Sequence, residues 1–248
     1  MAEKSRQPRY KVIACEIFFR EICLLAARCD NLLDLEFLRK GLHDAGREKM
    51  RQELQNAIND CAVKGYDAIM LAYGRCNDGL AGLVAPDCPL VIPRAHDCIT
   101  LFFGARQAYD QYFAQFPGTY FRTTGWTERS EGGDDSVMAQ LGLNRTYEEY
   151  VAKYGKENAD YIMESLGGWE KSYKYIAYIE LGLPQDAAYT EKARAEAAQR
   201  GLEFQIIKGN WRLLENLLAG NWPSEDFLVV PPGQRVAADN EGQILRLE

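Results

Sequence analysis

The stretch that decides the fold is a run of apolar and aromatic residues followed at once by a glycine, an arginine and a cysteine: Ala68-Ile69-Met70-Leu71-Ala72-Tyr73-Gly74-Arg75-Cys76. A continuous apolar run of this length, without polar alternation, is typical of a strand that is buried on both faces of a sheet. Such strands belong to parallel sheets, whose strands are joined by crossover helices. The run therefore predicts an α/β protein.

The segments on both sides of this run alternate between strand and helix patterns. Further strands are predicted at residues 11–15, 32–38, 90–92, 118–123, 174–180, 202–207 and 227–230. Helices are predicted at residues 18–29, 46–64 (capped by Asp44), 146–166, 190–200 (capped by Thr190) and 211–218. The alternation predicts mainly parallel sheets with helices on both faces, arranged as two Rossmann-like lobes.

The expected break between the lobes is residues 128–136, which contain a glycine-rich acidic segment at residues 131–135 (EGGDD). The expected domains are an N-terminal α/β lobe at residues 1–130, which carries most of the candidate site residues, and a C-terminal α/β lobe at residues 131–248. One continuous domain is the alternative.

The composition of the chain argues against two classes of binding partner, nucleic acids and membranes. The 248 residues carry a net charge of -7, which argues against a general nucleic-acid binder, because phosphate neutralisation needs clustered lysine and arginine. The N-terminus is polar, and no apolar run approaches the roughly 20 residues that span a bilayer. We expect a cytoplasmic protein without nucleic-acid or membrane partners. The seven cysteines then are free thiols or metal ligands rather than disulfides.

Both histidines and three of the cysteines lie just beyond predicted strands, where open parallel sheets bind their ligands. Thiolates of Cys15, Cys76 and Cys98 with the imidazole of His96 would form a site for zinc or another thiophilic metal. The spacing from His96 to Cys98 suits two ligands from one extended turn, because alternate side chains point the same way. His43 is a reserve ligand or an acid–base group.

Three other polar or aromatic residues are candidates for catalysis or substrate binding. Arg94 can clamp a carboxylate or phosphate, or form a salt bridge with Glu16 or Asp97. Asp97 is a candidate catalytic acid that can also orient His96 or cap the following helix. Trp126 offers an aromatic wall for a substrate, although aromatic residues lie more often in a core.

The same residues allow two interpretations without a metal. Free cysteine is among the most buried residue types and often acts as a small hydrophobe, so the thiols can be packing residues. Alternatively, a thiolate at Cys98 or Cys15 is a nucleophile and His96 its general base.

Taken together, the motifs resemble an uncharacterised prokaryotic family, the domain of unknown function 1638. The matching pieces are Ala14-Cys15-Glu16, Arg20-Glu21, Leu42-His43, Tyr73-Gly74 with Cys76, residues 93–99 (PRAHDCI), Gly104, residues 117–120 (PGTY) and Gly125-Trp126. The resemblance is closest over residues 11–126. It implies a cytosolic protein of bacteria or archaea, often associated with anaerobic corrinoid-dependent methyl transfer, and implies no established reaction. Asn77 follows Cys76 where the family pattern has glycine.

Two functional hypotheses follow. The first is a metal-dependent enzyme or metal-centred binding protein that acts on a small anionic or thiol-containing molecule and is linked to corrinoid-dependent methyl transfer, with a corrinoid protein as partner. The second is a non-catalytic binding module for a corrinoid, a small metabolite or a protein partner.

Overall fold

The computed structural model describes residues 6–61, 65–129, 147–156, 158–160 and 173–248. The chain divides into two units: unit 1 is Met1–Asp110 with Gly209–Glu248, and unit 2 is Gln111–Lys208. This division differs from the expected boundary near residue 130, because the C-terminal segment returns to the first sheet. The acidic segment at residues 131–135 lies outside the described residues.

Unit 1 is built on a five-stranded sheet with the order β2-β1-β3-β4-β8. Its strands are β1 (Arg9–Cys15), β2 (Leu32–Leu38), β3 (Ala68–Ala72), β4 (Leu90–Pro93) and β8 (Phe227–Val230). The first four are parallel, and β8 pairs antiparallel with β4. β3 is buried along its whole length, as its apolar run predicts. The expected α/β fold with mainly parallel sheet is confirmed.

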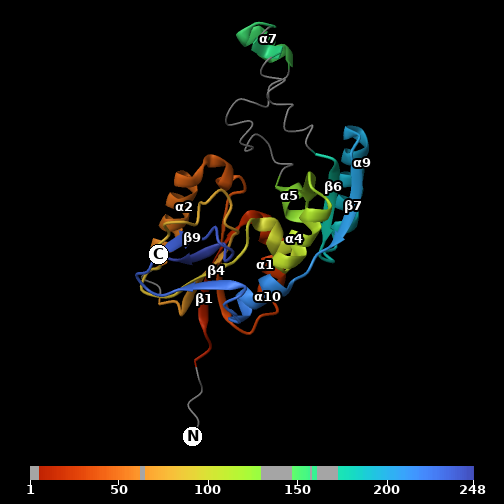
Figure 1. Ribbon diagram of the computed structural model, residues 1–248. Helices are drawn as coiled ribbons and strands as arrows, with labels where there is room; N and C mark the ends of the chain where they lie inside the picture. The colour runs from red at the N-terminus through yellow and green to blue at the C-terminus, as the bar shows by residue number, and fades with distance from the viewer. Residues whose placement is uncertain (1–5, 62–64, 130–146, 157, 161–172) are drawn as a thin grey trace. The chain divides into compact units, whose positions relative to one another are not determined.

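Helices cover both faces of this sheet. The crossover from β1 to β2 runs through η1 (Glu16–Phe18) and α1 (Phe19–Ala26), and the crossover to β3 runs through η2 (Leu42–Ala45) and α2 (Arg47–Asn59). These crossovers move in opposite directions along the sheet, so their right-handedness places α1 and α2 on opposite faces. Figure 1 shows α2 on one side of the strands, with α1 and α10 (Arg212–Ala219) on the other.

Several elements of unit 1 were not expected from the sequence. They are the helix α4 (Arg106–Gln115), which continues into unit 2, and the antiparallel pair β9 (Val236–Ala238) and β10 (Leu245–Leu247). The helix α3 (Cys98–Phe103) is the one that Asp97 was expected to cap. The expected helix at residues 46–64 ends at Asn59, and the residue that precedes it is Gly46 rather than the expected cap Asp44.

Unit 2 contains a three-stranded parallel sheet with the order β5-β6-β7. Its elements are β5 (Thr119–Arg122), α5 (Thr124–Glu128), α7 (Tyr147–Tyr154), β6 (Tyr175–Glu180), α9 (Asp186–Arg200) and β7 (Glu203–Lys208). The expectation that Thr190 caps α9 is wrong. Asp186 begins this helix instead, and its Oδ2 accepts hydrogen bonds from the N–H groups of Leu181, Gly182 and Leu183 at 2.9, 2.8 and 3.0 Å.

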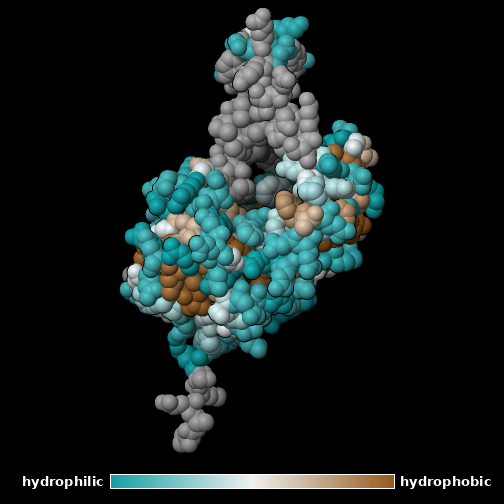
Figure 2. Space-filling view, viewed as in Figure 1, coloured by the Kyte–Doolittle hydropathy of each residue, from teal (hydrophilic) through white to brown (hydrophobic). Residues whose placement is uncertain are grey.

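Hydrophilic residues cover most of the molecular face shown in Figure 2, and hydrophobic residues show in smaller patches. In the described part of the chain, no helix is both long and apolar enough to cross a membrane.

Candidate functional site

The carboxyl ends of β1, β3 and β4 meet at one edge of the unit 1 sheet. Cys15 is the last residue of β1, and Ala14 lies opposite Ala72 in the register of β1 and β3. Beyond the strands, the N–H of Arg75 donates to the carbonyl of Ala95 at 2.8 Å, and the N–H of Cys76 donates to that of His96 at 3.1 Å. The segments that follow β3 and β4 therefore continue side by side past the sheet edge.

Glycine is required where these two segments touch. A side-chain carbon at Gly74 would overlap the backbone of Asp97. Because position 74 has no side chain, the chain after β3 can pass close enough for Cys76 to meet the residues that follow β4.

Three thiols come together at this edge, and we call Cys15, Cys76 and Cys98 the thiol cluster. The Sγ atoms of Cys76 and Cys98 are 3.6 Å apart. A hydrogen bond with the Cys15 thiol raises the pKa of Cys98 well above its ordinary value, and burial adds to the rise. The pKa of Cys76 is also well above its ordinary value, because of its hydrogen bond with Cys98 and then burial. Cys76 and Cys98 therefore carry protonated thiols at neutral pH.

Tyr73 is a buried polar residue at the end of β3 that was not among the expected site residues. It is 2 % exposed, and its hydroxyl is buried with no hydrogen-bond partner in the described residues. Burial raises the pKa of Tyr73 well above its ordinary value, and the thiols of Cys15, Cys98 and Cys76 add to the rise. The phenol therefore stays protonated. Its signal in the sequence was its position between a buried strand and Gly74-Arg75-Cys76.

A turn of unusual backbone conformation carries Cys76. Cys76, Asn77 and Asp78 have positive φ values of 22°, 52° and 57°. Arg75 supports this turn: its guanidinium pairs with Asp78, donates to the carbonyl of Asp239 at 3.1 Å and donates to Oδ1 of Asn240 at 2.8 Å. Non-glycine residues in this region are strained and often cluster at functional sites.

His96 touches the thiol cluster through its backbone, since its carbonyl accepts the N–H of Cys76. It is exposed and lines a pocket of about 380 Å³ together with Arg75, Arg106, Asp110, Asp239, Asn240, Gly242 and Ile244. The expectation that His96 and Cys98 point the same way assumed one extended segment. Cys98 is instead the first residue of α3, so the alternation ends at Asp97.

Arg94 and Asp97 both have structural partners. The Arg94 guanidinium donates to the carbonyls of Ser224 at 2.8 Å, Gln243 at 2.9 Å and Leu245, and so holds the C-terminal segments against β4. Asp97 caps α3: its Oδ1 accepts from the N–H of Thr100 at 3.1 Å, while its Oδ2 accepts from the hydroxyl of Tyr109 at 2.9 Å. The cap was one of the roles expected for Asp97, whereas the structure adds nothing to the catalytic expectations for these two residues.

Two other candidates are placed elsewhere. His43 lies in η2, and its side chain is outside the described parts of the structure. Trp126 lies in α5, which belongs to unit 2, whereas the thiol cluster belongs to unit 1.

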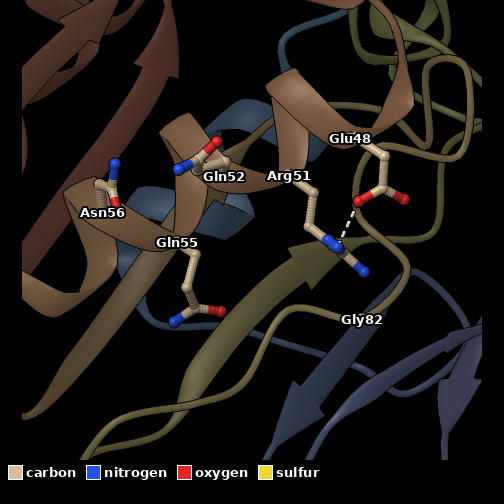
Figure 3. A pocket seen from close by; sticks show the side chains of 6 residues that line it. All are labelled: Glu48, Arg51, Gln52, Gln55, Asn56 and Gly82. Atoms are coloured by element: carbon tan, nitrogen blue, oxygen red, sulfur yellow. Dashed lines mark hydrogen bonds and ion pairs between the residues drawn. The ribbon is translucent and has the colours of Figure 1, made fainter.

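A second pocket, of about 270 Å³, lies along α2 and is lined by Glu48, Arg51, Gln52, Gln55, Asn56 and Gly82 (Figure 3). Its main polar groups already have partners. Arg51 pairs with Glu48, and Gln55 accepts from the N–H of Val84 at 2.8 Å and donates to its carbonyl at 3.1 Å. The two bonds of Gln55 hold the loop after Gly82 against α2, which indicates a structural role.

The thiol cluster is not arranged as a finished metal centre. Among the described residues, no group of three or more histidine, cysteine, aspartate or glutamate side chains is placed to hold a metal ion. The three thiols therefore meet through thiol–thiol hydrogen bonds rather than around a common centre.

Comparison with known families agrees with the resemblance seen in the motifs. A family model described as a protein of unknown function (DUF1638) matches residues 37–218. The chain belongs to the DUF1638 family. The matched range contains Cys76, His96 and Cys98, whereas Cys15 precedes it. No curated protein and no solved structure matches the chain.

Proposed function

We propose that the thiol cluster binds one thiophilic metal ion, with zinc as the first candidate, and presents it to a small thiol-containing or anionic molecule. The 3.6 Å separation of the Cys76 and Cys98 sulfur atoms carries this proposal. In a tetrahedral site with zinc–sulfur bonds of about 2.3 Å, neighbouring sulfur atoms lie about 3.8 Å apart. Two of the three ligands are therefore already near the spacing that zinc requires.

Metal binding requires two changes in the thiol cluster. The thiols must lose their protons, since the thiolate is the ligand, and their hydrogen bonds to one another must give way to a shared centre. Both changes involve side chains at the ends of β1, β3 and β4, whose backbones are fixed by the sheet. Three protein ligands leave a fourth position open, which is the arrangement of catalytic rather than structural zinc sites.

The molecule that fills this position is expected to carry a thiol. A metal here would keep that thiol deprotonated and nucleophilic at neutral pH, which suits methyl transfer from a corrinoid protein. The pocket lined by His96 and Arg106 is the proposed place for the anionic end of the bound molecule. Two of its residues belong to the segments that carry the cluster: Arg75 directly precedes Cys76, and His96 lies two residues before Cys98. The corrinoid link rests on the family resemblance.

We place this activity in the cytoplasm. All seven cysteines are free, and the cluster thiols lie close enough to hydrogen-bond without being joined. Free thiols persist in a reducing compartment, which is where a thiolate site remains competent to bind metal.

Elemental analysis of protein purified without oxygen tests the proposal. We expect close to one zinc, iron or cobalt ion per chain, and we expect Cys98→Ser to lose most of it. The matched control is Cys61→Ser, because Cys61 is a buried thiol outside the cluster that donates to the carbonyl of Ala57 at 2.9 Å within its own helical segment. The control should retain the metal. Protein that is metal-free and takes up none of these ions would contradict the proposal, as would equal metal content in the two variants.

The second candidate is a binding module without a metal, in which the three cysteines are packing residues. The mutual hydrogen bonds of the protonated thiols favour it, since they satisfy these side chains without any ligand. This candidate predicts that a small-molecule ligand raises the melting temperature of the chain and that Cys98→Ser leaves the increase unchanged.

A further inference from the structure

Cys76 and Cys98 are two free cysteines whose sulfur atoms are in contact. Their Sγ atoms are 3.6 Å apart, and a disulfide bond would bring them to about 2.0 Å. Both residues are half-buried rather than closed off from solvent. The two sulfur atoms therefore lie within about 1.5 Å of a covalent bond, at a place that a small reagent can reach.

The backbone holds these two cysteines side by side. The N–H of Cys76 donates to the carbonyl of His96 at 3.1 Å, two residues before Cys98. The missing side chain at Gly74 lets the two segments approach this closely. Cys76 itself lies in a turn beyond the end of β3, so its side chain can move the remaining distance without disturbing the pairing of a strand.

The other thiols of unit 1 are placed less favourably for oxidation. Cys15 is 4 % exposed and ends β1, which pairs with β2 on one side and β3 on the other. Its backbone therefore cannot shift toward Cys98 without breaking the sheet. The thiols of Cys29 and Cys61 donate to backbone carbonyl groups, at 3.4 and 2.9 Å. Oxidation is thus expected at Cys76 and Cys98 rather than at these thiols.

We propose that Cys76 and Cys98 form a reversible disulfide bond by exchange with a small-molecule disulfide. The Cys76 thiolate attacks one sulfur of the reagent, which breaks the reagent's S–S bond, forms a mixed disulfide and releases one thiolate. The Cys98 thiolate then attacks Sγ of Cys76, and the second reagent thiolate leaves. The two released thiolates take up the protons that the cysteines lose. Two protein thiols are oxidised, and one reagent disulfide is reduced to two thiols.

This disulfide forms from the chain's own thiols and requires no metal. Disulfides in reducing compartments are mostly transient and serve catalysis or redox sensing, so a reversible bond suits the proposed cytoplasmic location. Once the bond has formed, Cys15 is the only cluster thiol that remains free. The oxidised chain therefore cannot hold the metal ion of the proposed function, and the disulfide would switch that function off.

Exchange with 2-hydroxyethyl disulfide tests the proposal on the full chain, reduced and freed of metal by a chelator. The reaction is run at about pH 8.5, because the pKa of both thiols lies well above its ordinary value and the thiolate is the attacking form. We expect the chain to lose two of its seven free thiols and to retain no reagent. Peptide mapping by mass spectrometry should find Cys76 joined to Cys98, and dithiothreitol should restore both thiols.

Cys98→Ser separates exchange at this pair from general thiol reactivity. The variant keeps the attacking thiol of Cys76 but lacks the thiol that displaces the reagent. We therefore expect one reagent molecule to remain attached at Cys76. The matched control is Cys61→Ser, which changes a buried thiol outside the cluster and should form the same disulfide as the wild type.

Three results with the wild type would each overturn the proposal. They are a bond from Cys98 to Cys15, reagent attached to Cys76 without an internal bond, and a chain that keeps all of its thiols. The metal site is judged separately. If Cys76 and Cys98 become joined in a protein that takes up no zinc, iron or cobalt when reduced, the disulfide stands and the proposed function fails.

Discussion

Single residues at the edge of the unit 1 sheet decide whether the thiols can meet. Gly74 passes so close to Asp97 that no side chain fits, and Asn77 occupies a left-handed position with a φ of 52°. Asparagine is among the few residues that tolerate this conformation, which explains how it can stand where the family pattern has glycine. The substitution therefore preserves the turn that carries Cys76.

Gly74→Ala tests the close approach at residue scale. The added carbon would overlap backbone atoms, which cannot rotate away, so we expect the free energy of unfolding to fall by about 2–4 kcal/mol. Gly65→Ala is the control, because position 65 has a positive φ of 65° but no atom within 4 Å of the added carbon. It should cost about 1 kcal/mol, for backbone strain alone. Urea unfolding of both variants makes the measurement, and equal losses would contradict the crowding at Gly74.

At the scale of elements, β5 and α9 of unit 2 are joined by one carboxylate between two guanidinium groups. Arg122 donates to both oxygens of Glu196, at 2.9 and 2.6 Å, and Arg200 donates to Oε1 at 3.2 Å. Burial raises the pKa of Glu196, but the hydrogen bonds from Arg122 outweigh it, so the pKa lies below its ordinary value. The folded unit therefore binds the ionised carboxylate more strongly than the unfolded chain does.

The pH dependence of this pair follows from the lowered pKa. A carboxylate whose pKa is lower when folded stabilises the fold above its unfolded pKa of about 4.3, and the contribution is lost as the pH falls through the folded value. At pH 7, Glu196→Gln should lower the free energy of unfolding by about 1–3 kcal/mol, and the difference from the wild type should shrink steadily below about pH 4. Circular dichroism during urea unfolding at several pH values measures it.

The control for this prediction is Glu191→Gln. Glu191 pairs with Arg194 at 3.3 Å, but their side chains are 69 % and 50 % exposed, so the change should cost little at any pH. A pH-independent loss in Glu196→Gln would show that its charge does not contribute to stability.

Elements with strong apolar patterns were predictable from the sequence, and those defined by tertiary contacts were not. The strand expected at residues 32–38 matches β2 in full, because its apolar and β-compatible residues are bounded by polar turns. The start of α9 was misplaced, because Asp186 caps the preceding loop through three backbone N–H groups rather than through a local sequence motif. The short pair β9 and β10 carries too few residues for its pattern to stand out.

At the scale of the whole molecule, the rule that ligands bind beyond the carboxyl ends of parallel strands pointed to three thiols that also meet in the structure. They meet because Cys15 ends β1, and Cys76 and Cys98 follow the neighbouring strands β3 and β4. The rule could not predict that the side chains of His96 and Arg94 point elsewhere than the three thiols do. The direction of a side chain after a strand depends on where the next helix begins. Nor could the rule show that Arg94 serves the returning C-terminal segment, whose pairing with β4 spans more than half of the chain.

X-ray absorption spectroscopy at the zinc edge tests the central claim, that Cys15, Cys76 and Cys98 hold one metal ion, most directly. For protein loaded with one equivalent of zinc without oxygen, the account predicts three sulfur ligands at about 2.3 Å and a fourth, lighter ligand that is replaced by sulfur when 2-mercaptoethanol is added. The sulfur count should fall to two in Cys98→Ser. A zinc ion surrounded only by nitrogen and oxygen ligands would contradict the account.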